Sequence, residues 1–114
     1  MFSHEKLQVY QRSIEWLAAS NKLVKTFPMG NADLANQLRR ATLSVPLNIA
    51  EGAGKTSKLD KKRNYGIARG SALECAAILD AVEVLELSDV DSVRYGKKLL
   101  YEVVAMLSTL CLKQ

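Results

Sequence analysis

The chain has 114 residues, of which 48% are apolar and 25% are charged, the balance of one ordinary soluble globular domain. No stretch approaches the roughly 18 consecutive apolar residues that a membrane span requires, and the first residues contain no apolar signal-peptide core. The two cysteines, Cys75 and Cys111, do not have the spacing of a zinc motif or of a disulfide framework. We therefore expect a cytoplasmic, single-domain protein without a metal, a cofactor or a membrane segment.

Positive charge is concentrated in the middle of the chain. The formal net charge is +4, but the segment 39–69 alone has eight basic residues against two acidic ones. The eight basic residues are Arg39, Arg40, Lys55, Lys58, Lys61, Lys62, Arg63 and Arg69. A localised basic face is typical of a polyanion-binding protein, whereas a solvated lysine-rich helix that keeps a small protein soluble would give the same pattern. Charge alone leaves both interpretations open.

Apolar residues recur at steps of three and four along the whole chain, which predicts helices and no strands. The expected helices cover about residues 4–26, 32–52, 58–87 and 92–112. Ser3, Asn31, Ser57 and Asp91 are the expected N-terminal caps. Because short turns join these helices, the sequence predicts an all-α, antiparallel, up-down-up-down four-helix bundle.

Two apolar rows run along the first expected helix. The first row predicts the core face and comprises Leu7, Tyr10, Ile14, Leu17 and Val24. The second row, Val9, Trp16 and Leu23, repeats every seven residues on the flank of the first. It either closes the edge of the bundle or forms an interface between subunits of an oligomer.

The other helices each have one predicted core row. In the second helix the row is Leu34, Leu38, Ala41, Val45 and Ile49, with Pro46 expected to kink the helix rather than to break it. In the fourth it is Val93, Leu100, Val103, Leu107 and Leu110.

The third helix has a less usual predicted row, because it includes a carboxylate: Ile67, Ser71, Glu74, Ile78, Ala81 and Leu85. A buried carboxylate without a partner would be costly, so we expect an ion pair between Glu74 and Arg40 of the second helix.

Residues for catalysis are scarce. His4 is the only histidine, which leaves no base for a nucleophilic serine or cysteine and no Glu-x-x-His metal motif. Gly54-Lys55-Thr56 matches the end of a phosphate-binding loop, but Ile49 stands where that pattern requires glycine, and a helix precedes it where a strand is needed. We expect no catalytic residues and a protein that is not an enzyme.

One segment is distinctive: Leu38-Arg39-Arg40-Ala41 followed by Ser44-Val45-Pro46-Leu47-Asn48-Ile49-Ala50-Glu51-Gly52, and then Lys61-Lys62-Arg63. It resembles the bacterial four-helix bundle proteins of the ribosomal-RNA intervening-sequence family, which are related to the accessory proteins of diversity-generating retroelements. The resemblance implies a four-helix bundle, a homo-oligomer such as the five-fold rings of the retroelement relatives, and a role with nucleic acid. It supplies no catalytic set. In this chain the Arg-Arg-Ala step falls on Arg39 and Arg40.

Two functional hypotheses follow, with an enzyme a distant third. In the first, the eight basic residues contact phosphates of RNA or DNA without reading sequence. In the second, the chain is a ring-forming scaffold for a protein partner, and its basic residues serve solubility or ion pairing. An enzyme would need a composite site built only in the oligomer.

Overall fold

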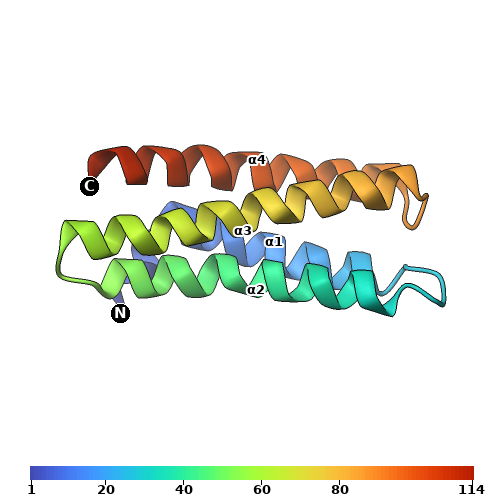
Figure 1. The fold of residues 1–114 in the computed structure, drawn as a ribbon, viewed down its shortest axis with the longest axis horizontal. Coiled ribbons are helices and arrows are strands. Elements are labelled where there is room, and N and C mark those ends of the chain that lie inside the picture. The colour runs from blue at the N-terminus through green and yellow to red at the C-terminus, as the bar shows by residue number, and fades with distance from the viewer.

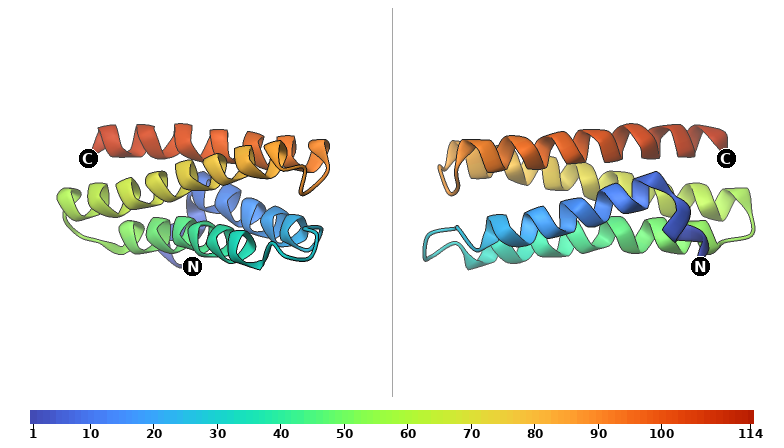
Figure 2. Two further views of the ribbon diagram at one scale, coloured as in Figure 1. Left: turned by 45° about the vertical axis from the view of Figure 1, so that its right-hand side comes forward. Right: turned by 180° about the vertical axis from the view of Figure 1, so that it is seen from behind.

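The computed structural model describes all of residues 1–114 and is entirely helical. A short 3₁₀ helix, η1 (Ser3–Lys6), precedes α1 (Gln8–Val24), α2 (Ala32–Gly54), α3 (Lys58–Val84) and α4 (Val90–Lys113). Helix α1 packs against α2 and α4, and α3 packs against the same two helices from the other side. The chain runs up and down in alternation, with both termini and the α2–α3 turn at one end (Figure 1; Figure 2). The predicted four-helix bundle is confirmed.

The start of the first helix differs from the prediction. Leu7 is extended, with φ −78° and ψ 126°, and it separates η1 from α1, so Ser3 does not cap a long helix. Aromatic packing accounts for the separate turn: the Phe2 ring stacks on His4 at 5.8 Å, and His4 meets Tyr10 edge-on at 4.6 Å between ring centroids. The first residues thereby fold back as a turn of their own.

The remaining caps are partly as predicted. The Ser57 hydroxyl accepts a hydrogen bond from the Asp60 backbone N–H at 3.0 Å, which confirms it as the cap of α3. Helix α4 begins two residues before the expected position, because the Asp89 carboxylate, and not Asp91, accepts from the Ser92 backbone N–H at 2.9 Å. Asn31 precedes α2, but its amide donates to the Pro28 carbonyl instead of capping the helix.

The predicted core rows of α2 and α4 are correct. In α2 only Leu34 of the five predicted residues is not fully buried, and in α4 only Leu110. Pro46 is itself buried, and α2 continues through it to Gly54. The helix is not broken there, as the continuing apolar spacing indicated.

The core row of α1 is not the predicted one. The buried residues at steps of four and three are Val9, Ser13, Trp16, Ser20 and Leu23. The interpretation of Val9, Trp16 and Leu23 as a subunit interface is therefore wrong, since Trp16 is 0% exposed within one chain. The two serines conceal this row in the sequence. Their hydroxyls donate to backbone carbonyls one turn earlier, at 2.6 and 3.0 Å, and so they are buried without a lost hydrogen bond.

The core row of α3 is displaced by about one residue from the predicted row. The buried residues are Asn64, Tyr65, Ala68, Ala72, Cys75, Ile78, Leu79 and Val82. Ile78 is the one residue of the predicted row that is buried. Small side chains at three of these positions weaken the hydrophobic signal while they let α2 approach closely. Glu74 consequently lies on the exposed side, as does Arg40, and neither is in an ion pair. The prediction of a buried Arg40–Glu74 pair is wrong.

Candidate nucleic-acid interface

A chain of polar side chains joins α2 to α3 through the distinctive segment. The Ser71 hydroxyl donates to the Ser44 hydroxyl at 2.7 Å, and the Asn48 amide donates to the same residue. The buried Asn64 amide donates to Asn48 Oδ1 at 3.2 Å and to Glu51 Oε2 at 2.6 Å. The two helices are therefore held in one register by hydrogen bonds.

The last turn of α2 lies directly against α3. A Cβ placed on Gly52 would lie 2.9 Å from the Tyr65 ring and 3.0 Å from the Asn64 Cβ, so only glycine fits between the helices. The Lys61 ammonium donates to the Gly52 and Ala53 carbonyls at 3.3 and 3.0 Å and so satisfies two C-terminal acceptors of α2. Burial raises the pKa of the Tyr65 phenol. These contacts fix the direction in which the α2–α3 turn leaves the bundle.

Charge is segregated between the two ends of the bundle, one with both termini and the α2–α3 turn, the other with the α1–α2 and α3–α4 turns (the ends are seen in Figure 1). We call the end formed by residues 1–6, 51–63 and 113–114 the basic end; it has seven basic and three acidic side chains. The opposite end, residues 20–36 and 80–96, has three basic and six acidic side chains and is called the acidic end. A bundle charged in this way presents a positive potential at one end only.

Four of the predicted residues are exposed at the basic end: Lys55, Lys58, Lys62 and Arg63. Arg63 has one acidic neighbour, Asp60, at 3.9 Å, which is a long and exposed contact. Lys61 lies among them but is only partly exposed, because its ammonium is engaged at the end of α2. The turn therefore presents a compact group of four available cations, with Lys61 in a structural role.

Arg69 lies further along α3 and borders an open hollow. Its Nε donates to the Ser108 hydroxyl at 2.7 Å, and that hydroxyl donates in turn to the Val104 carbonyl at 2.8 Å. The hollow has a volume of about 400 Å³ and lies between α3 and α4. Its lining residues are Lys62, Gly66, Arg69, Ser108, Cys111 and Leu112. The guanidinium is thus held in place at one edge while its other nitrogens are left without a protein partner.

Arg39 and Arg40 do not join this group. They lie about 22 Å along α2 from its C-terminal end, at 1.5 Å per residue. Arg39 donates to the Asn36 side chain at 3.3 Å and lines a second hollow between α1 and α2. The predicted set of eight basic residues is therefore divided into two separate regions.

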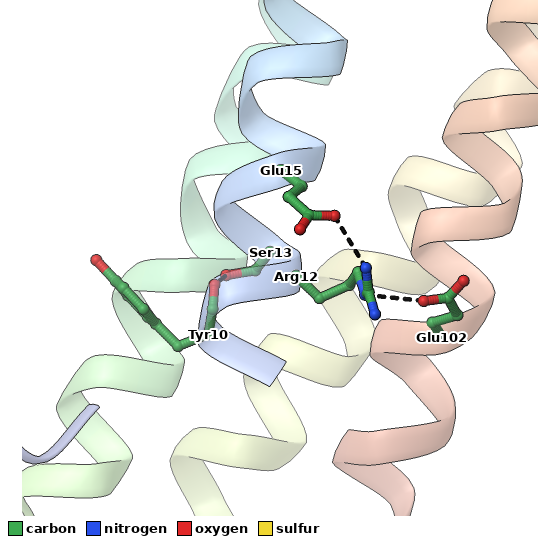
Figure 3. Close-up of polar contacts among 5 residues, drawn as sticks. All are labelled: Tyr10, Arg12, Ser13, Glu15 and Glu102. Carbon is green, nitrogen blue, oxygen red and sulfur yellow. Dashed lines mark hydrogen bonds and ion pairs between the residues drawn. The ribbon is translucent and has the colours of Figure 1, made fainter. Parts of the chain in front are cut away.

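A polar cluster between α1 and α4 was missed by the sequence analysis. Arg12 Nε lies 2.8 Å from Glu102 Oε2, and Arg12 Nη1 lies 3.0 Å from Glu15 Oε2 (Figure 3). The hydrogen bond with Glu15, followed by the charge of Glu102, raises the pKa of Arg12. The Arg12–Glu15 spacing of three residues was a visible helical signal, but the partner on α4 was not. This cluster links α1 to α4 by an ion pair, so we assign it a structural role.

Other reactive groups are few. The Cys75 thiol is buried beside the Thr42 hydroxyl at 3.6 Å, and burial raises its pKa. Cys111 is partly exposed. No group of three metal-ligating side chains occurs, and none of the four helices combines the length and the hydropathy of a membrane span.

A comparison with protein families gives a match over most of the chain, including the distinctive segment. The family model described as 23S rRNA-intervening sequence protein matches residues 5–109. The chain belongs to the 23S rRNA-intervening sequence protein family. In this member the distinctive segment serves the pairing of α2 with α3, through Asn48, Glu51 and Gly52. The search of curated proteins returned no match.

Proposed function

We propose that this member of the 23S rRNA-intervening sequence protein family is a non-enzymatic, cytoplasmic homo-oligomer that binds nucleic acid, RNA in preference to DNA, through its basic end. The observation that carries the proposal is the segregation of charge, with four available cations grouped at the α2–α3 turn. The family description, which refers to ribosomal RNA, supports RNA as the polyanion.

The type of contact follows from the residues. Lys55, Lys58 and Lys62 have flexible side chains with compact charges, which suit phosphate oxygens better than base edges. Such contacts release counterions, so affinity falls steeply as salt rises. We therefore expect binding that depends on salt and little on sequence.

The proposal of a non-enzymatic role rests on the available side chains. His4, the one histidine, stacks on the Phe2 ring and meets the Tyr10 ring edge-on, so its ring faces aromatic side chains and not a nucleophile. The more buried thiol, Cys75, has its pKa raised by burial, the opposite of an activated nucleophile. Acid–base or covalent catalysis has little support in this arrangement.

Self-association is supported by an exposed apolar patch that we define as Ile14, Leu17, Leu43 and Leu47. Ile14, Leu43 and Leu47 are 39%, 47% and 63% exposed, and three of the four residues line the hollow of about 400 Å³ between α1 and α2. An apolar patch that a single chain leaves open favours a contact between subunits. We propose this patch, in place of the buried Trp16 row, as the homo-oligomer interface, with a pentameric ring as the expected assembly.

Light-scattering mass of the purified protein, with and without a mixed-sequence RNA at low and at high salt, tests the proposal. We expect an oligomeric mass that rises with RNA at low salt and returns to the protein-only value at high salt. An oligomer that ignores RNA at both salts would contradict RNA binding. That result would favour the alternative function, a ring-forming scaffold for a protein partner. A monomeric mass would contradict the oligomer.

A further inference from the structure

The groove between α3 and α4 has two parts with different chemistry. Its part near the basic end is the hollow that Lys62 and Arg69 border. Further along the same two helices is a smaller hollow of about 170 Å³, lined by Leu73, Ala76, Lys97, Leu100, Tyr101 and Val104. Neither hollow is lined by a carboxylate, whereas Glu15 lines the hollow between α1 and α4. The groove thus combines cations and an apolar floor, and the one carboxylate bound to a lining residue, that of Asp80, is paired with Lys97 at 2.6 Å.

The two parts of the groove follow one another along α4. Tyr101 precedes Ser108, the residue that holds Arg69, by two helical turns or about 10 Å. The Tyr101 side chain is 77% exposed, so a flat aromatic ring is available to a ligand. Lys97 is not an available cation because its ammonium is bound to Asp80 at 2.6 Å.

We infer that a single strand of RNA lies along this groove, with Arg69 and Lys62 on its phosphates and an unpaired base stacked on Tyr101. The inference rests on the proposed function and adds a path and a strand preference to it. The hydroxyl of Ser108 fixes one edge of the Arg69 guanidinium, which leaves the terminal nitrogens oriented for a phosphate. A base can stack on an aromatic ring only where it is not paired, so the groove selects single strands over duplex.

Fluorescence anisotropy with a labelled mixed-sequence RNA of about twelve nucleotides, and with its duplex, tests the inference. Tyr101→Ala is expected to weaken single-strand binding about tenfold without changing the salt slope, because stacking involves no counterion release. Tyr95→Ala is the matched control, since Tyr95 is exposed on the same helix but lines the α1–α4 hollow. Duplex binding is expected to be unaffected by either variant.

Removing a positive charge from the groove should change the salt dependence of binding, which the tyrosine substitution should not. Arg69→Gln is expected to lower the salt slope by about 0.7, the value for one phosphate of a single strand, whereas Arg94→Gln at the acidic end should not change it. A wild-type affinity for RNA that falls steeply with salt, together with Tyr101→Ala and Arg69→Gln variants that bind like wild type, would overturn binding in the groove. That result would leave the proposed interface at the basic end intact. If wild-type protein shows no salt-dependent binding, the proposed function fails and the groove with it.

Cys111 provides a probe of occupancy, because it lines the hollow and the other cysteine is 0% exposed. The single-stranded RNA is expected to slow alkylation of Cys111 by a maleimide several-fold in wild-type protein and to have less effect in Arg69→Gln. Alkylation that responds to protein concentration but not to RNA would assign the groove to a second copy of the chain and overturn the inference.

Discussion

At the scale of single residues, two glycines on neighbouring helices have opposite roles. A Cβ on Gly96 of α4 would lie 2.8 Å from the Trp16 ring and 3.0 Å from Leu79 Cδ1, so the glycine lets three helices meet around one indole. A Cβ on Gly70 of α3 would have nothing within 4 Å. The first glycine is required by packing, whereas the second only weakens its helix.

We therefore predict that Gly96→Ala lowers the free energy of unfolding by about 1–3 kcal/mol, because the added methyl overpacks a rigid ring. Gly70→Ala, the matched control, should raise it by about 0.5–1 kcal/mol through helix propensity. Denaturant unfolding of both variants measures the difference. Equal stabilisation by the two alanines would contradict the packing of Trp16 against Gly96.

The N-terminal cap of α4, Asp89, makes part of the folding stability depend on pH. Hydrogen bonds from Ser92 hold the pKa of Asp89 below its usual range. A lowered folded-state pKa contributes stability above the unfolded-state pKa, and this contribution is lost as pH falls through the folded-state pKa.

Asp89→Ala should accordingly be less stable than wild type at neutral pH, and the difference should shrink as pH falls below about 4. Chemical denaturation at a series of pH values measures it. Asp91→Ala is the control, because Asp91 makes no capping contact, and a similar loss in both variants would contradict the assignment of the cap.

At the scale of helices, the sequence predicted four elements, their order and the core rows of α2 and α4. These rows consist of large aliphatic residues whose spacing is unambiguous, such as Leu38 and Val45. In α1 the row of Val9, Trp16 and Leu23 is visible in the sequence. It does not stand out as the main core face, because Ser13 and Ser20 occupy its other positions. In α3 small core residues such as Ala72 hide the row. A serine whose hydroxyl bonds its own helix, or an alanine against which a neighbouring helix packs, adds little to the hydrophobic pattern of the sequence. The burial of such residues is set by tertiary packing and cannot be read from that pattern.

The hydrogen bonds between α2 and α3 give a prediction at the scale of helices. Asn64→Ala removes two hydrogen bonds and leaves Asn48 without its partner on α3, at an expected cost of about 1–3 kcal/mol in unfolding free energy. A double-mutant cycle with Glu51→Ala measures the coupling between the two helices. Additive effects of the two substitutions would show that the Asn64–Glu51 contact contributes nothing to stability.

The proposed homo-oligomer interface gives a second prediction at the scale of helices. Leu43→Glu combined with Leu47→Glu should reduce the mass in solution while leaving helicity unchanged, because both side chains are exposed in one chain. Size-exclusion chromatography with light scattering measures the mass, and circular dichroism measures the helicity. Trp16→Glu is the contrasting variant, which should lose helicity because Trp16 is in the core. An unchanged mass in the double variant would exclude the apolar patch as the interface.

At the scale of the whole molecule, the sequence shows the basic composition of the candidate site but not how the basic residues are arranged. Lys55, Lys58, Lys62 and Arg63 lie together because they are adjacent in the chain, and their contact with nucleic acid stays a prediction. The separation of Arg39 from them depends on the length of α2, and the capping role of Lys61 depends on how α2 ends against α3. The acidic opposite end arises only when residues far apart in sequence fold to the same place.

The salt dependence of RNA binding in two charge-matched double variants tests the central claim most directly. Lys58→Ala/Lys62→Ala removes two charges from the basic end, and Lys22→Ala/Lys25→Ala removes two from the acidic end. The first pair should flatten the plot of log affinity against log salt by about 1.4, at roughly 0.7 for each phosphate of a single strand, and the second should leave it unchanged. Equal slopes in the two variants would contradict an interface at the basic end.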